Sequence, residues 1–236
     1  MRILAFDSTA KAASVALCEN GRPLGLYTID NGLTQSELLL PMAEDLLRSL
    51  KLSFSDVDLL AASVGPGSFT GVRIGVSLVK GIAFGHGTPC VAVSTLEALA
   101  ESLNGLRGYI VPCMDARRGQ VYSAIFYSDG EKLARITEDM AISLVDLAEK
   151  LKELSDEPIY LSGDGYDVAR GALLAHGVKL ESTPTLLRGE NAYSVAAVAL
   201  RKYEAGEATD DLEFSPTYLR LPQAERERLE REKEKK

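Results

Sequence analysis

The sequence of 236 residues contains few of the residues that build metal and disulfide sites. Its two histidines, His86 and His176, lie too far apart to form the His pair of a metal-binding helix. Its three cysteines, Cys18, Cys90 and Cys113, form no CxxC pair, so neither a disulfide framework nor a zinc site is expected. These absences exclude catalysis that depends on a pair of histidines on one helix.

Long hydrophobic runs and an excess of positive charge are also missing. No apolar segment approaches the roughly 20 residues that a membrane helix requires, and the first apolar stretch ends at Asp7, too short for a signal peptide. The net charge of −8 disfavours independent binding of nucleic acid, because phosphate contacts dominate that affinity. A content of 46% hydrophobic and 25% charged residues is typical of a folded globular chain. We therefore expect a cytoplasmic protein with reduced thiols and no membrane association.

A repeated order of strands and helices indicates two α/β lobes. The first strand ends at Asp7 and a hairpin turn follows at Gly21, 14 positions on; in the second half Asp115 and Gly130 are 15 positions apart. The expected domains are residues 1–105, completed by a C-terminal helix, then a smaller lobe over 106–215, and a C-terminal segment with a charged tail over 216–236. Strands are expected at 3–6, 14–18, 24–28, 59–64, 91–93, 109–114, 121–127, 132–136 and 159–162, and helices at 35–50, 71–84, 94–103, 144–154, 168–175 and 191–205.

Two acidic strand ends are candidates for the walls of a nucleotide cleft. Asp7-Ser8-Thr9 follows the first strand, and an Asp with two hydroxyls at such a position can hold a metal-bound phosphate. Asp115 ends the equivalent strand of the second lobe. Each motif is also a common turn in which Asp and Ser bond their own backbone. Arg117 and Arg118 stand where a phosphate loop needs small residues, and they either bind an anion or pair with acids of a partner.

Glycine-rich turns follow two further strands. Gly65–Gly75 reads GPGSFTGVRIG and leads from a buried strand into a helix, a position where helix N-termini bind anions. It matches neither the P-loop nor GxGxxG, so we favour a tight turn in which Gly71 and Gly75 let another helix approach closely. Gly163-Asp164-Gly165 either approaches an adenosine or forms a plain turn.

Four segments together resemble the TsaB family over essentially the whole chain: ILAFDST, GPGSFTGVRIG, MDARRGQVY and the late P-x-YLR. The second of these is highly specific. The resemblance implies an actin-like, sugar-kinase-like fold of two ribonuclease-H-like lobes, each a mixed sheet with a three-strand antiparallel meander plus parallel strands, flanked by helices. One departure is Gln35, where relatives often carry His before Ser-Glu.

The resemblance implies a non-catalytic partner protein. Family members act with TsaD-type proteins, which share the fold, and with the TsaE-type ATPase to form threonylcarbamoyladenosine beside the anticodon of tRNA. TsaD relatives hold a metal with a His-x-x-x-His motif that this chain lacks. No catalytic residue, metal or required cofactor is therefore expected, and a homodimer is expected when TsaD is absent. Any weak binding of ATP or ADP would take place in a vestigial nucleotide cleft. The residues expected to form this cleft are Asp7, Ser8, Thr9, Asp115, Gly163, Asp164 and Gly165.

The first long helix is the expected partner surface. Over residues 35–50 its apolar residues cover more than the roughly 100° that faces its own sheet, and an exposed surplus marks a protein interface. With the following helix, the expected interface residues are Leu39, Leu40, Leu47, Gly71, Gly75 and Val76. The alternative is that a loop covers Leu40.

Two other functions stay open at this stage. An ATP-dependent small-molecule kinase or nucleotide hydrolase of the same fold is supported by Asp7, Asp115 and Gly163–Gly165, and opposed by the two arginines in the Asp115 turn. A peptidase is the least favoured, because the chain has no candidate metal site.

Overall fold

The computed structural model describes residues 1–220, and the charged tail expected beyond Pro222 lies outside them. Two sheets and six α-helices form the described part of the chain. The strands are β1 (Arg2–Asp7), β2 (Ala13–Glu19), β3 (Arg22–Ile29), β4 (Leu59–Ser63), β5 (Cys90–Val93), β6 (Gly108–Asp115), β7 (Gln120–Ser123), β8 (Phe126–Ser128), β9 (Leu133–Arg135), β10 (Met140–Ser143) and β11 (Ile159–Ser162). The helices are α1 (Gln35–Ser49), α2 (Phe69–His86), α3 (Thr95–Glu101), α4 (Leu144–Lys152), α5 (Tyr166–Ala175) and α6 (Ala192–Glu204), with short 3₁₀ turns at Phe54–Asp56 and Thr185–Leu187.

The first sheet has the expected mixed topology. Its order is β3-β2-β1-β4-β5, with β1, β2 and β3 antiparallel and β1, β4 and β5 parallel. Successive residues of β1 point to opposite faces. Leu4 and Phe6 pack in the core under α1 and α2, whereas Ile3 and Ala5 pack against α6. Both faces of this sheet are therefore covered, which explains the nearly uninterrupted apolar runs of its central strands.

The second sheet repeats the meander with one interruption. β6 pairs antiparallel with both β7 and β8 and parallel with β11. The single strand expected at 121–127 is wrong, because the chain breaks at Ala124 and Ile125. There the carbonyl of Ile125 accepts from the amides of Ile136 and Thr137, and its amide donates to the Thr137 hydroxyl. The hairpin partner is split in the same way into β9 and β10, of which β10 was not expected.

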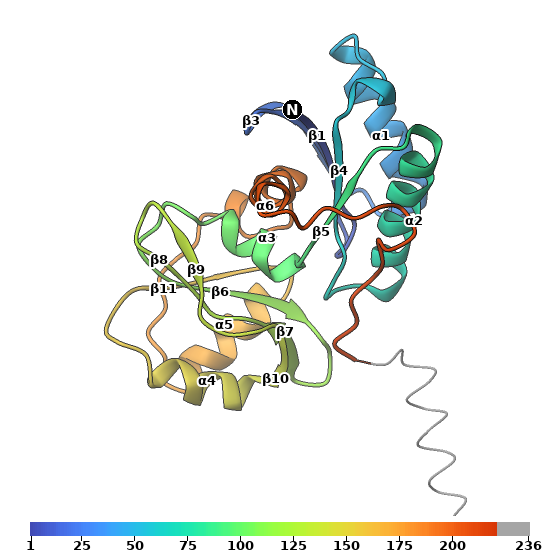
Figure 1. Ribbon diagram of the computed structural model, residues 1–236. Coiled ribbons are helices and arrows are strands. Elements are labelled where there is room, and N and C mark those ends of the chain that lie inside the picture. Colours follow the sequence, from blue (N-terminus) through green and yellow to red (C-terminus); the bar gives the residue numbers. More distant parts are fainter. Residues whose placement is uncertain (221–236) are drawn as a thin grey trace, which may run out of the picture.

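Two helices form a shared layer between the sheets (Figure 1). α6 covers the face of the first sheet opposite α1 and α2, and α3 packs between α6 and β6. α4 and α5 cover the outer face of the second sheet, where their core includes Val111 and Leu161. The layers therefore run from the α1–α2 pair through the first sheet, the α6–α3 layer and the second sheet to the α4–α5 pair. This arrangement is the two-lobed α/β fold that the resemblance implied.

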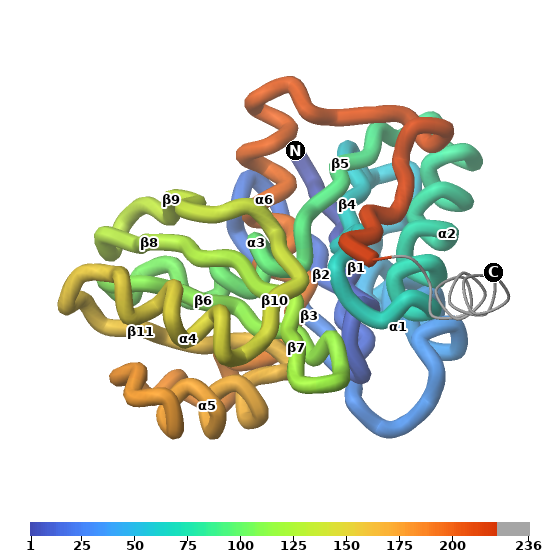
Figure 2. The backbone as a smooth tube through the Cα atoms, turned by 90° about the horizontal axis from the view of Figure 1, so that it is seen from below, coloured from blue at the N-terminus to red at the C-terminus, as the bar shows by residue number. Residues whose placement is uncertain are grey.

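After α6 the chain returns to the first lobe, as Figure 2 shows. Thr209 forms an isolated bridge with Cys90 at the edge of β5. Phe214, 1% exposed, then inserts into the core beneath α2. None of the helices within residues 1–220 is both long and apolar enough to cross a membrane.

Candidate functional site

A cleft of about 740 Å³ lies between the lobes, beside the carboxyl ends of β1 and β6. The first lobe contributes Thr9 and the start of α2, and the second lobe contributes Asp115 and Asp164. The C-terminal segment supplies part of the wall through Thr217–Arg220. Of the seven residues expected to form a nucleotide cleft, only Thr9, Asp115 and Asp164 line it.

Asp7 lies beneath the cleft and is 2% exposed. Its Oδ1 accepts from the Thr9 amide at 2.9 Å and from the Thr9 hydroxyl at 2.8 Å, and its Oδ2 accepts from the Ser63 hydroxyl at 2.5 Å. Burial raises the pKa of this carboxyl, and the three hydrogen bonds oppose that shift. Both carboxyl oxygens of Asp7 are thus engaged by the first lobe itself.

The glycines after β4 fit the loop that follows β1. A Cβ on Gly67 would collide with the Thr9 carbonyl, and one on Gly71 or Gly75 would collide with the Ser8 carbonyl or hydroxyl. The Ser8 hydroxyl donates to the Gly71 carbonyl at 2.9 Å. The expected close packing at Gly71 and Gly75 is therefore present, but the neighbour is the Ser8 loop and not another helix. GPGSFTGVRIG is in the first place a motif that packs the turn after β4 and the first turns of α2 against the loop after β1.

The turn Gly163-Asp164-Gly165 packs on the end of β6. A Cβ on either glycine would collide with the Cys113 carbonyl, and Gly163 has a φ of +95°. The two glycines therefore allow close contact with the backbone of β6, and they do not face the cleft. Asp164 does, and its Oδ1 accepts from the Asp115 amide at 2.9 Å. Burial, with the charge of Asp115 as a weaker cause, raises the Asp164 pKa, while that hydrogen bond lowers it.

Glu190 is a buried acid that the sequence interpretation missed. It precedes α6, is 8% exposed, and its Oε1 has no hydrogen-bond partner among residues 1–220. Burial, followed by the nearby charge of Asp7, raises the pKa of Glu190 to about 8. No sequence motif marks it, because its environment comes from both lobes. Within residues 1–220, no three side chains of His, Cys, Asp or Glu are arranged to hold a metal ion.

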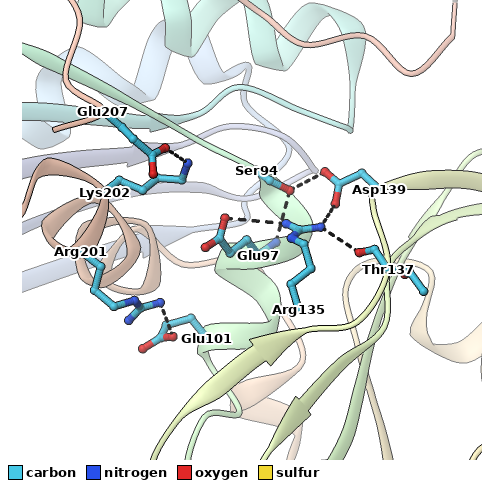
Figure 3. A network of polar contacts seen from close by, with 9 residues as sticks. All are labelled: Ser94, Glu97, Glu101, Arg135, Thr137, Asp139, Arg201, Lys202 and Glu207. Atoms are coloured by element: carbon cyan, nitrogen blue, oxygen red, sulfur yellow. Dashed lines mark hydrogen bonds and ion pairs between the residues drawn. The ribbon is translucent and has the colours of Figure 1, made fainter. Parts of the chain in front are cut away.

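A polar network holds the lobes together around α3 (Figure 3). Asp139 of the second lobe accepts from Ser94, the N-cap of α3, at 2.6 Å and from Arg135 at 2.6 Å. Arg135 also pairs with Glu97 of α3 at 3.7 Å. On the other side of α3, Glu101 pairs with Arg201 of α6 at 2.8 Å. Because these contacts join the second sheet to α3 and α3 to α6, they fix the lobes relative to each other.

The expected interface residues divide into core and surface. Leu39, Leu47 and Val76 are 1%, 2% and 3% exposed and belong to the first-lobe core, so the apolar surplus expected at Leu39 and Leu47 of α1 is wrong. The cause is that α1 packs on α2 as well as on its sheet, so its buried face is wider. Gly71 and Gly75 are buried against Ser8. Leu40 is 39% exposed, and its place at an interface stays a prediction.

Two α/β lobes of this topology, facing each other across a cleft with an acidic strand end on each side, define a member of the actin-like class of proteins. Comparison with known proteins places the chain more closely. The family model described as "TsaD: tRNA N6-adenosine threonylcarbamoyltransferase" matches residues 34–228. The tRNA threonylcarbamoyladenosine biosynthesis protein TsaB of Bacillus subtilis (strain 168) is 31% identical over 234 residues, which cover 99% of this chain and 100% of that protein.

Two further relatives support the same family. The TsaB protein of Escherichia coli (strain K12) is 31% identical over 223 residues, covering 93% of this chain and 95% of that protein. The solved structure "YeaZ from Pseudomonas aeruginosa" superposes with a TM-score of 0.74 at 25% identity, covering 92% of this chain and 99% of that one. The chain therefore belongs to the TsaB family, within the wider family that the TsaD-named model describes.

Proposed function

We propose that this chain is a non-catalytic scaffold subunit in the formation of tRNA N6-threonylcarbamoyladenosine, and that it binds and activates a TsaD-type transferase together with a TsaE-type ATPase. The relatives named as TsaB proteins support the pathway, since they match nearly the full chain. The match to a TsaD-named model supports a partner of related fold. The proposal places the protein in the cytoplasm and gives it no independent binding of tRNA, in keeping with its net charge of −8.

The observation that carries the non-catalytic role is the state of Asp7. A strand-end carboxylate that serves a nucleotide in catalysis must reach the cleft, with an oxygen free for the metal or the phosphate. Here Asp7 is buried, does not line the cleft, and accepts hydrogen bonds on both oxygens from Thr9 and Ser63. Any ATP or ADP would bind weakly and without turnover.

The proposed partner surface is the outer face of α1 and α2. Leu40 and Phe84 are exposed there, at 39% and 80%. α1 presents Glu44 to solvent, beside an ion pair between Asp45 and Arg48, and α2 presents Arg73. In a two-fold pairing, α1 of one copy facing α2 of the other would bring unlike charges together around the apolar residues. We propose that a homodimer forms through this face when the TsaD-type partner is absent.

The test is co-purification with a TsaD-type protein, with the molar mass measured for the chain alone and for the mixture. Leu40→Glu places a charge against apolar surface and is expected to weaken association by about 30-fold or more, the equivalent of about 2 kcal/mol. Leu174→Glu is the matched control, because Leu174 is 42% exposed but lies on α5 of the other lobe. Thermal melting of both variants shows that each one folds.

One result would correct the partner surface, and another would overturn the non-catalytic role. Association that is equal in Leu40→Glu, Leu174→Glu and the unmodified chain would remove Leu40 from the interface. ATP turnover by the pure protein, abolished by Asp7→Ala, would instead favour the kinase or hydrolase alternative.

A further inference from the structure

The C-terminal segment is anchored first on the first lobe. Phe214 is buried in its core, and the Lys80 ammonium of α2 donates to the carbonyls of Leu212 at 3.2 Å and Phe214 at 2.9 Å. A buried aromatic ring and a cation with two backbone partners hold this part of the chain in one place. The six residues after Phe214 therefore start from a fixed point beside α2.

From that point the segment crosses the loop between β4 and α2. The Thr217 amide donates to the Val64 carbonyl at 2.8 Å, and its carbonyl lies so close to Gly65 that a Cβ there would collide with it. The Tyr218 ring packs on Phe69, the first residue of α2, with centroids 5.0 Å apart. These contacts bring residues 217–220 to the mouth of the cleft, where they form part of its wall.

Arg220 then reaches across to the second lobe. Its guanidinium donates to the Ala116 carbonyl at 3.5 Å and to the Gln120 side chain, and lies 5.6 Å from the centroid of the Tyr122 ring. All three partners belong to the turn between β6 and β7 or to β7 itself. The guanidinium is thus shared among a carbonyl, an amide and an aromatic face, a combination that lysine does not reproduce.

The turn that Arg220 contacts has an unusual backbone. Arg117, Arg118 and Gly119 have φ values of +63°, +56° and +72°, which are left-handed. Two consecutive non-glycine residues in this region are strained and persist only when surrounding contacts hold them. Within the turn, Asp115 accepts from the Arg117 amide at 2.7 Å. Arg220 is the additional contact that comes from the C-terminal segment.

We infer that residues 215–220 are an intramolecular latch, in which Arg220 clamps the β6–β7 turn of the second lobe to the first lobe and so closes one side of the cleft. The latch does not depend on the scaffold role proposed above, because all its contacts lie within one chain. A ligand or protein segment that enters the cleft from this side displaces residues 217–220. Because Tyr218 of the latch packs on Phe69, release of the latch changes the surroundings of the first turn of α2.

Hydrogen exchange on the full chain tests the latch. In Arg220→Ala, amides of residues 116–122 and 217–220 are expected to exchange about tenfold faster, which corresponds to the loss of one charge-assisted hydrogen bond of about 1.4 kcal/mol. Amides of β1 and β4 should be unchanged. Arg107→Ala is the control, since it removes an exposed second-lobe ion pair with Glu157 and should leave both latch segments protected.

A second variant approaches the same contact from the other lobe. Gln120→Ala keeps the C-terminal segment intact and should reproduce the faster exchange, so it carries the test if Arg220→Ala fails to fold. The double variant should add little to Arg220→Ala, because Arg220→Ala already removes the contact with Gln120. Unchanged exchange at residues 116–122 in both single variants overturns the latch. An even increase over the whole chain also overturns it, because that result reports a general loss of stability.

Discussion

Glu190→Gln gives a sharp test of the buried acid between the lobes. The side chain is 8% exposed, its Oε1 has no hydrogen-bond partner in the described part of the chain, and the charge of Asp7 lies nearby. The pKa of Glu190 is about 8 in the folded chain, against 4.5 for an unperturbed glutamate. Glutamine has nearly the same shape but carries no charge at any pH, so the variant removes the ionisation and keeps most of the packing.

The sign of the effect follows from proton binding. Between pH 4.5 and 8 the folded state holds a proton on Glu190 that the unfolded state has released, so the free energy of unfolding falls as the pH rises through this window. The slope is about 1.4 kcal/mol per pH unit, because one pKa unit is worth 1.36 kcal/mol. From pH 5.5 to 7.5 the unmodified chain should lose roughly 2–3 kcal/mol that Glu190→Gln does not lose. Burial raises the pKa of Asp7 as well, so a decline with pH also remains in the variant.

Urea denaturation at a series of pH values measures this difference. Plotted against pH, the free energies of unfolding of the unmodified chain and of Glu190→Gln should run parallel below about pH 4.5. Above about pH 8 the difference between the two free energies should be constant. For a chain of 236 residues, 2–3 kcal/mol corresponds to roughly 5–10 °C in Tm. Glu153→Gln, at an exposed glutamate after α4, is the control and should show no such gap. Parallel curves for Glu190→Gln and the unmodified chain from pH 5 to 8 would refute the reasoning.

Three further predictions follow from packing and burial. Gly71→Ala should destabilise the fold by about 1–3 kcal/mol or more in urea denaturation, because the added Cβ meets the Ser8 carbonyl. Gly81→Ala on the same helix is the control and should be neutral or stabilising by up to ~1 kcal/mol, because its Cβ enters open space. Equal effects of the two variants would contradict the packing of Gly71 on the Ser8 loop. Phe214→Ala should cost about 3–5 kcal/mol of unfolding free energy, and a loss below ~1 kcal/mol would show that the ring is not part of the core. The three buried cysteines should resist a thiol reagent at pH 8 until the chain unfolds, because burial raises their pKa values to about 11 or 12; rapid labelling of the folded chain would disprove this.

Much of the fold could be predicted because local patterns determine it. The Thr34 amide donates to the Glu37 carboxylate at 3.0 Å and Ser94 accepts from the Glu97 amide at 3.3 Å, so both predicted helix starts are confirmed. The continuous apolar run at 59–64 is a buried parallel strand, as expected. The break at Ala124 and Ile125 could not be predicted, because it depends on hydrogen bonds of Ile125 with Ile136 and Thr137, in the segment between β9 and β10.

The candidate site was predictable only in part. Its glycines and acids are visible as motifs, and their positions after strands follow from the α/β pattern. The neighbours of these residues cannot be seen in the sequence. Gly163 faces β6, Gly71 faces Ser8, and Asp7 accepts a hydrogen bond from Ser63, 56 positions away. A motif states which residues are present, and packing decides whether they face a ligand or the protein itself.

The amino-acid pattern by itself determined the order of the elements, the doubling of the lobes and the family likeness, because these depend on hydrophobic periodicity, capping and short turns. Only the tertiary structure decided that Leu39 is buried while Leu40 is exposed, since α2 covers part of the α1 surface. Only the tertiary structure likewise brought Glu190 near Asp7 and Arg220 onto Ala116. These contacts join residues more than 100 positions apart, and no local propensity encodes which distant surfaces meet when the two lobes close on their shared helices.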